Sequence, residues 1–84
     1  PMLDALRPLI DKHARLPVKA DTLAAGQDLY AAGLTSFAAV QLMLALEEAF
    51  DIEFPERMLN RRSFATMESI AACIQELRPQ ALAS

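Results

Sequence analysis

The sequence predicts an all-α fold, a small bundle of three main helices plus one short helix, with a long first loop. Alanine and leucine dominate the composition, and both residues favour helix. Aromatic residues make up only 6% of the chain, and the β-branched residues that favour strands are also scarce. A chain of 84 residues is expected to form one domain, residues 1–84, with a simple core and no deep substrate cavity.

The first helix is predicted over about Leu3–Ala14, because apolar residues recur there at helical spacing. Pro8 removes one backbone hydrogen bond, but we expect one continuous helix that tolerates it. The helix ends at Leu16-Pro17, since a residue before proline disfavours helical dihedral angles. The predicted inward face consists of Leu3, Leu6, Leu9, Ile10 and His13.

The stretch from Leu16 to Thr35 is predicted to be the long first loop, in which Asp21 and Asp28 are suited to caps or turns. A short helical turn is possible at Asp21. A loop of about 20 residues is long for a compact domain, so its own side chains are expected to fix it. The side chains expected to do so are Leu23, Leu29, Tyr30 and Leu34.

The clearest element is a helix from Ser36 to about Phe50. Its predicted buried stripe is Ala39, Leu42, Met43, Leu46, Ala49 and Phe50. The residues predicted to face away from the core are Gln41, Glu47, Glu48 and Asp51. Val40 and Leu44 lie outside the apolar stripe, where solvent is expected, so they indicate burial on a second side or contact with a partner.

An extended link is predicted over residues 51–55, and Pro55 suits the first position of a short third helix over about Pro55–Leu59. Residues 60–65 are predicted to form a second loop. Thr66 is a good N-cap for the last helix, which is expected to reach about Leu77. Residues 79–84 are expected to form a frayed tail.

Composition excludes several functions. One cysteine, Cys73, and one histidine, His13, exclude a disulfide framework and Cys-based or His-rich metal sites. We identify no arrangement of catalytic residues and expect no enzyme. The net charge of −3 argues against nucleic-acid binding, and no apolar run approaches the length of a membrane span. Because no secretory signal is evident and Pro1 before Met2 resembles a cloning remnant, we expect a free-standing cytoplasmic protein.

Ser36 is the residue most suited to carry chemistry, because it directly precedes the strongest helix. One interpretation is structural: the hydroxyl caps the helix by accepting a hydrogen bond from a backbone N–H. The other is functional, since a helix N-terminus favours a phosphate and presents this hydroxyl to another protein. The two interpretations are compatible.

The segment Asp28–Phe37, DLYAAGLTSF, resembles the phosphopantetheine attachment motif of acyl and peptidyl carrier proteins. Residues 42–55, LMLALEEAFDIEFP, are similar to the second-helix and turn sequence of stand-alone acyl carrier proteins. Thr66-Met67 is similar to the start of the last helix in that family. The resemblance therefore extends over almost the whole chain and implies an acyl-carrier-protein-like fold.

The resemblance implies that Ser36 bears 4′-phosphopantetheine, attached by a phosphopantetheinyl transferase from coenzyme A. A loading ligase would place an aminoacyl or acyl group on the arm as a thioester, and the arm would then present it to a downstream acceptor enzyme. We expect a monomer whose partner-binding residues, as the resemblance implies, are Thr35, Phe37, Val40, Gln41, Leu44, Glu47, Glu48 and Arg57.

The sequence departs from the family pattern beside the site, where Thr35 replaces the usual Asp and Phe37 the usual Leu. Ala38 and Gln41 occupy positions that are often acidic in fatty-acid carriers, and three arginines make the short-helix region basic, Arg57, Arg61 and Arg62. These changes favour a specialised partner and suggest the stand-alone aminoacyl carrier proteins, which are loaded by seryl-tRNA-synthetase-like ligases. A fatty-acid or polyketide carrier stays open as an alternative, as does an unmodified helical interaction module.

Overall fold

The computed structural model describes residues 1–78, which form four α-helices and three short 3₁₀ helices. The α-helices are α1 (Met2–His13), α2 (Leu29–Ala32), α3 (Ser36–Phe50) and α4 (Met67–Leu77). The 3₁₀ helices are η1 (Ala20–Thr22), η2 (Glu56–Met58) and η3 (Arg61–Phe64). This architecture confirms the predicted all-α bundle with three main helices. The tail predicted over residues 79–84 lies outside the described residues.

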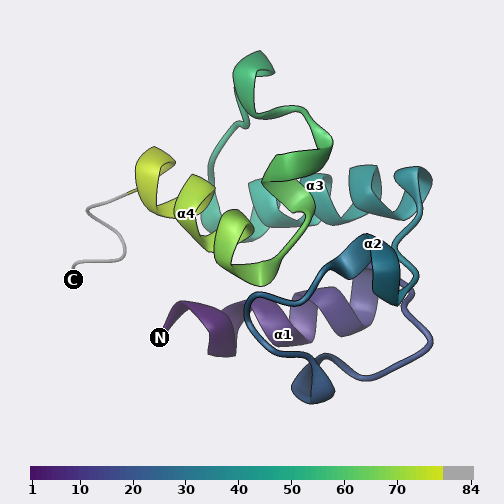
Figure 1. Ribbon diagram of the computed structural model, residues 1–84. Coiled ribbons are helices and arrows are strands. Elements are labelled where there is room, and N and C mark those ends of the chain that lie inside the picture. The colour runs from purple at the N-terminus through teal and green to yellow at the C-terminus, as the bar shows by residue number, and fades with distance from the viewer. Residues whose placement is uncertain (79–84) are drawn as a thin grey trace.

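The three long helices enclose one apolar core, with α1 packed against both α3 and α4 (Figure 1). Pro8 lies inside a continuous α1, as predicted. Within the segment that joins α3 to α4, the rings of Phe54 and Phe64 meet edge to face, with centroids 5.2 Å apart. The largest fully buried side chains are Leu6, Ile10, Leu29, Leu42, Leu46, Met67, Ile70 and Ile74.

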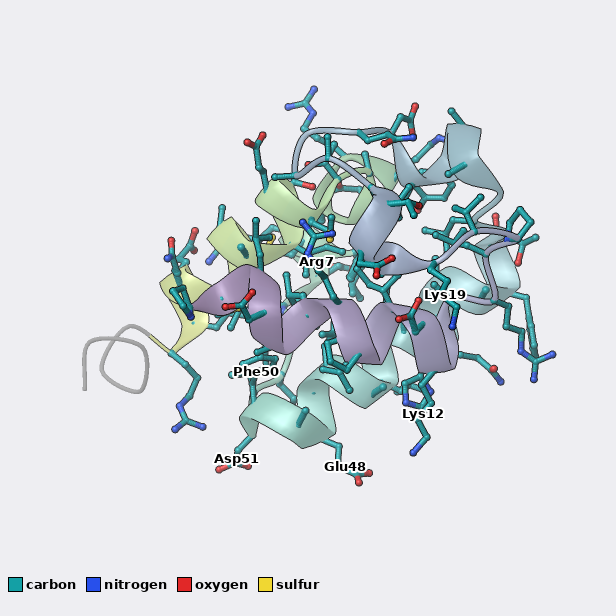
Figure 2. All side chains as sticks on the ribbon, turned by 90° about the horizontal axis from the view of Figure 1, so that it is seen from below. Arg7, Lys12, Lys19, Glu48, Phe50 and Asp51 are labelled. Carbon is teal, nitrogen blue, oxygen red and sulfur yellow. The ribbon has the colours of Figure 1, made fainter. Side chains whose placement is uncertain are left out.

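The first connection wraps around α1 and is held there by polar side chains (Figure 1). The guanidinium of Arg7 donates to the backbone oxygens of Ala20 and Leu23, and Figure 2 shows it extending from α1 away from α3. The carboxylate of Asp11 accepts from the backbone N–H of Ala20 at 2.8 Å. Apolar side chains were expected to fix this connection, and Leu23 among them is buried. The hydrogen bonds from α1 were not expected from the sequence.

Residues 29–32 were predicted to lie in a loop and instead form α2. The carboxylate of Asp28 caps this single turn by accepting from the N–H groups of Tyr30 and Ala31. Gly33 ends it with φ at 125°, a backbone conformation that glycine adopts without steric cost. Leu29 and Leu34 are buried on either side, so this turn fixes the approach to α3.

The segment between α3 and α4 is more ordered than predicted. Pro55 precedes η2 as its N-cap, so the short third helix is a 3₁₀ turn narrower than the predicted range. Residues 60–65, predicted to be a loop, contain η3, which Asn60 caps by accepting from the N–H of Ser63 at 2.9 Å. Thr66 caps α4 through a capping box with Ser69, which confirms the predicted helix start.

Candidate functional site

Ser36 is the first residue of α3, and its side chain is exposed. The residue that caps α3 is Thr35, whose Oγ1 accepts from the N–H of Ala38 at 3.0 Å. The interpretation of Ser36 as the N-cap is therefore wrong by one position. No hydrogen bond within residues 1–78 engages the Ser36 hydroxyl. Thr35 thus maintains the helix start and leaves the neighbouring hydroxyl available for chemistry.

An open cleft of about 460 Å³ lies beside Ser36. Its volume falls within the roughly 300–1,000 Å³ that is typical of small-molecule sites. The floor is mainly apolar, and the polar groups come from few side chains. The lining residues are Tyr30, Ser36, Ala39, Val40, Met43, Leu59, Asn60, Arg61 and Phe64.

Backbone hydrogen bonds bring the two walls of this cleft together. The N–H of Leu29 at the start of α2 donates to the carbonyl of Ala65, just after η3, at 2.7 Å. Tyr30 on α2 consequently lies against Arg61 on η3, whose guanidinium carbon is 3.9 Å from the centre of the tyrosine ring. This distance is typical of a cation–π contact, which fixes both side chains at the cleft.

An exposed apolar stripe runs along α3 and shares Val40 with the cleft lining. Phe37 is 67% exposed, Val40 53% and Leu44 54%. Their spacing of three and four residues places them on one face of the helix. The prediction that Val40 and Leu44 lie outside the core is confirmed, and Phe37 extends the same surface towards Ser36. Such a contiguous patch is typical of a protein-interaction surface.

The remaining residues predicted to bind a partner differ in whether their side chains are exposed or already have contacts within the fold. Glu48 is exposed and extends from α3 away from the body of the protein (Figure 2). Gln41 is half-buried, and so is Glu47, whose carboxylate accepts from the N–H of Phe54 at 2.9 Å. Arg57 forms an ion pair with Glu76 on α4. Glu47 and Arg57 therefore have partners within the fold, which sequence spacing did not reveal.

Several other residues singled out from the sequence lie outside the cleft and the exposed stripe. His13 ends α1 and Cys73 packs half-buried against the core, as expected for a structural thiol. Ala49 was predicted to be buried in the α3 stripe and is exposed instead. Among the described residues, no cluster of acidic, His and Cys side chains fits a metal ion. No helix in residues 1–78 has the length and apolar character needed to cross a membrane.

The contribution of η3 to the cleft was not expected from the sequence. Arg61 was noted only as part of a basic region, and Tyr30 only as an apolar contact of the first loop. The sequence contains one signal for this turn, Asn60, because an asparagine side chain often accepts a hydrogen bond from the backbone of a turn that follows it. That turn is what presents Arg61 to the cleft, but its pairing with α2 depends on tertiary contacts.

Comparison with known proteins extends this picture. A family model described as the phosphopantetheine attachment site matches residues 13–74. The aminoacyl carrier protein of Agrobacterium fabrum is 58% identical over 65 residues, which cover 77% of this chain and 78% of that protein. A carrier protein from Agrobacterium tumefaciens was crystallised with an engineered Bradyrhizobium japonicum glycine:carrier protein ligase and AMP. It matches with a TM-score of 0.86 at 53% identity, covering 88% of this chain and 99% of that one.

A solution structure of a protein from Agrobacterium tumefaciens matches with a TM-score of 0.74 at 48% identity. This match covers 99% of the present chain and 100% of the other. At these identities and coverages, the likeness extends to sequence and fold together.

Proposed function

Because the chain belongs to the phosphopantetheine attachment-site family, we propose that Ser36 bears the prosthetic group and that the protein carries an aminoacyl thioester. The observation that carries the assignment is the Ser36 hydroxyl, exposed beside the cleft and not used in capping α3. The bound group supplies a flexible arm that ends in a thiol, which explains why the chain needs no catalytic residues of its own.

The residues around Ser36 fit a phosphodiester at this position. Attachment forms a bond between Ser36 Oγ and phosphorus, displaces adenosine 3′,5′-bisphosphate from coenzyme A and releases the hydroxyl proton. Thr35 accepts only one of the first N–H groups of α3, so the helix N-terminus keeps donors and a dipole that favour an anion. The apolar floor formed by Ala39 and Met43 suits the aliphatic part of the arm.

The proposed cargo is a small amino acid rather than a long acyl chain. Support comes from the curated relative named aminoacyl carrier protein and from the carrier crystallised with a glycine:carrier protein ligase. A ligase of this kind would load the thiol, after a phosphopantetheinyl transferase had attached the arm, and an acceptor enzyme would then receive the amino acid. In this scheme the protein is a cytoplasmic, monomeric carrier with no catalytic activity.

The proposed docking surface for these enzymes is the exposed stripe of α3, Phe37, Val40 and Leu44, together with the exposed carboxylate of Glu48. Thr35 and Gln41 replace the acidic side chains common in fatty-acid carriers, which favours a partner that does not depend on strong charge attraction. An encounter of this size and composition is weak and transient, as a shuttling carrier requires.

Intact mass spectrometry tests the attachment site. The protein is incubated with coenzyme A and a promiscuous phosphopantetheinyl transferase, and one arm mass is expected on the wild type and none on Ser36→Ala. Thr22→Ala is the matched control, because Thr22 also carries an exposed hydroxyl but lies outside the cleft. Equal addition to Ser36→Ala, or none to the wild type, contradicts the proposal.

The exposed stripe of α3 also favours a second candidate, an unmodified helical interaction module. Partner binding would then depend on Val40 and Leu44 and be unaffected by Ser36→Ala. Isothermal titration of the glycine:carrier protein ligase with apo and arm-bearing protein separates the two functions. Stronger binding by the arm-bearing form supports the carrier, and equal binding supports the module.

A further inference from the structure

Arg61 is the one charged side chain among the described residues that line the cleft beside Ser36. No hydrogen bond or ion pair within residues 1–78 engages its guanidinium. Arg57 and Arg7 have partners, the first in an ion pair with Glu76 and the second in hydrogen bonds to the first connection. Arg61 thus differs from them in having unused donors at the cleft. Asn60 directly precedes η3 and also lines the cleft. Its side-chain amide is already engaged, because it caps η3 and donates to the carbonyl of Arg57.

The contact with Tyr30 fixes Arg61 while leaving its donors unused. The guanidinium carbon lies 3.9 Å from the centre of the Tyr30 ring, a separation at which a guanidinium stacks on a ring through its flat face. The N–H groups lie in the plane of the guanidinium and point away from its edge. Stacking on Tyr30 therefore restricts the side chain's rotation and preserves the planar set of donors that pairs with phosphate oxygens.

We infer that Arg61, held by Tyr30, is a positioning residue that binds the phosphodiester formed at Ser36 and keeps the start of the arm at the cleft. This inference rests on the proposed function, since it needs a phosphate on Ser36. The two residues line the same cleft, Ser36 from α3 and Arg61 from η3. A charge-assisted pair between the guanidinium and the phosphate adds a second fixed point to an arm otherwise tethered by one bond.

The apolar residues that line the cleft add to the effect of the pair between Arg61 and the phosphate. An arm oriented towards η3 at its phosphate lies beside Ala39, Val40 and Met43. Arg61 thereby favours a position of the arm along the cleft over a position free in solvent. A carrier of small cargo gains from this bias, because the cargo itself offers little apolar surface to hold the arm.

The test compares three holo proteins made with coenzyme A and a phosphopantetheinyl transferase: wild type, Arg61→Gln and Arg62→Gln. Arg62 is the matched control, because it is exposed, adjacent in sequence and absent from the cleft lining, and its substitution changes the net charge equally. The readouts are the ³¹P resonance of the phosphodiester and the ¹⁵N-correlated Nε–H resonance of Arg61. Mass spectrometry first verifies the arm on every sample.

The wild-type Arg61 Nε–H resonance is expected to move downfield from apo to holo protein. The ³¹P resonance is expected to shift in Arg61→Gln and to match the wild type in Arg62→Gln. An Nε–H resonance unchanged by attachment, or a ³¹P resonance equal in all three proteins, overturns the inference while the attachment itself stands. If no arm mass is added to the wild type, the proposed function fails and the inference fails with it.

The apo protein gives a second readout of the stacked pair. Tyr30 is the single tyrosine and tryptophan is absent, so intrinsic fluorescence reports on this ring alone. Arg61→Gln is expected to change the tyrosine emission, and Arg62→Gln to leave it as in the wild type. Identical emission in all three proteins contradicts the contact that holds Arg61. Because the apo-to-holo comparison of the wild type needs no variant, the inference remains testable even if Arg61→Gln does not fold.

Discussion

Replacing Gly33 with alanine tests the tight connection between α2 and α3. Gly33 has φ at 125° and ψ at 4°, and a left-handed backbone of this kind costs other residues about 1–3 kcal/mol. An added Cβ would also lie 2.9 Å from Cδ of Pro17, an atom of a rigid ring that cannot move away alone. Both effects act on the folded state and destabilise it.

The expected magnitude follows from these effects and one opposing term. Gly→Ala substitution restricts the unfolded chain and stabilises a protein by roughly 0.4–1 kcal/mol where the new residue fits. After this offset, we expect Gly33→Ala to lower the free energy of unfolding by about 2 kcal/mol. For a domain of this size, that loss lowers the Tm by roughly 10 °C.

Gly26→Ala is the matched control, because it adds the same methyl group to the same connection. Its Cβ would meet Oε1 of Glu68 at 3.2 Å, the end of a flexible, exposed side chain that can move. We expect its unfolding free energy to stay within about 0.5 kcal/mol of the wild type. Urea unfolding followed by circular dichroism measures both variants, and equal stabilities would refute the reasoning from backbone strain.

Three other substitutions separate folding from function. Thr35→Val removes the cap of α3 and is expected to cost about 1 kcal/mol in urea unfolding, whereas arm attachment to Ser36 continues in the mass assay. Glu47→Gln weakens a hydrogen bond across the turn after α3 and should cost about 1 kcal/mol, while Glu48→Gln should match the wild type; the reverse order would contradict the contact. Leu44→Asp is expected to weaken ligase binding roughly tenfold in calorimetry without changing the Tm, and unchanged affinity would exclude this face.

Long periodic segments were predictable from the sequence. The helix from Ser36 to Phe50 has its predicted bounds, because a stripe repeated over several turns determines the element, although Ala49 of the predicted stripe is exposed and Ala38 is buried instead. Thr66 was identified as the cap of α4 because a hydroxyl residue precedes a second such stripe. The family resemblance rested on the Asp28–Phe37 motif together with this long helix and the start of the last one, so it did not depend on any single short element.

Short elements and tertiary partners were not predictable in the same way. A turn of four residues, such as α2, has no apolar period to detect. Thr35 and Ser36 are adjacent hydroxyl residues, so composition alone did not reveal which one caps α3. The cleft depends on residues of α2, α3 and η3 that are far apart in sequence, and only the packing of these elements brings Arg61 to Ser36.

The cleft walls are joined through main-chain atoms, by the hydrogen bond between the N–H of Leu29 and the carbonyl of Ala65. A second such bond links the N–H of Glu68 to the carbonyl of Ala25. Neither bond depends on which side chains line the cleft. During evolution, substitutions at lining positions such as Met43 and Leu59 can therefore change the contacts that the cleft offers, while the main-chain frame beside Ser36 stays constant.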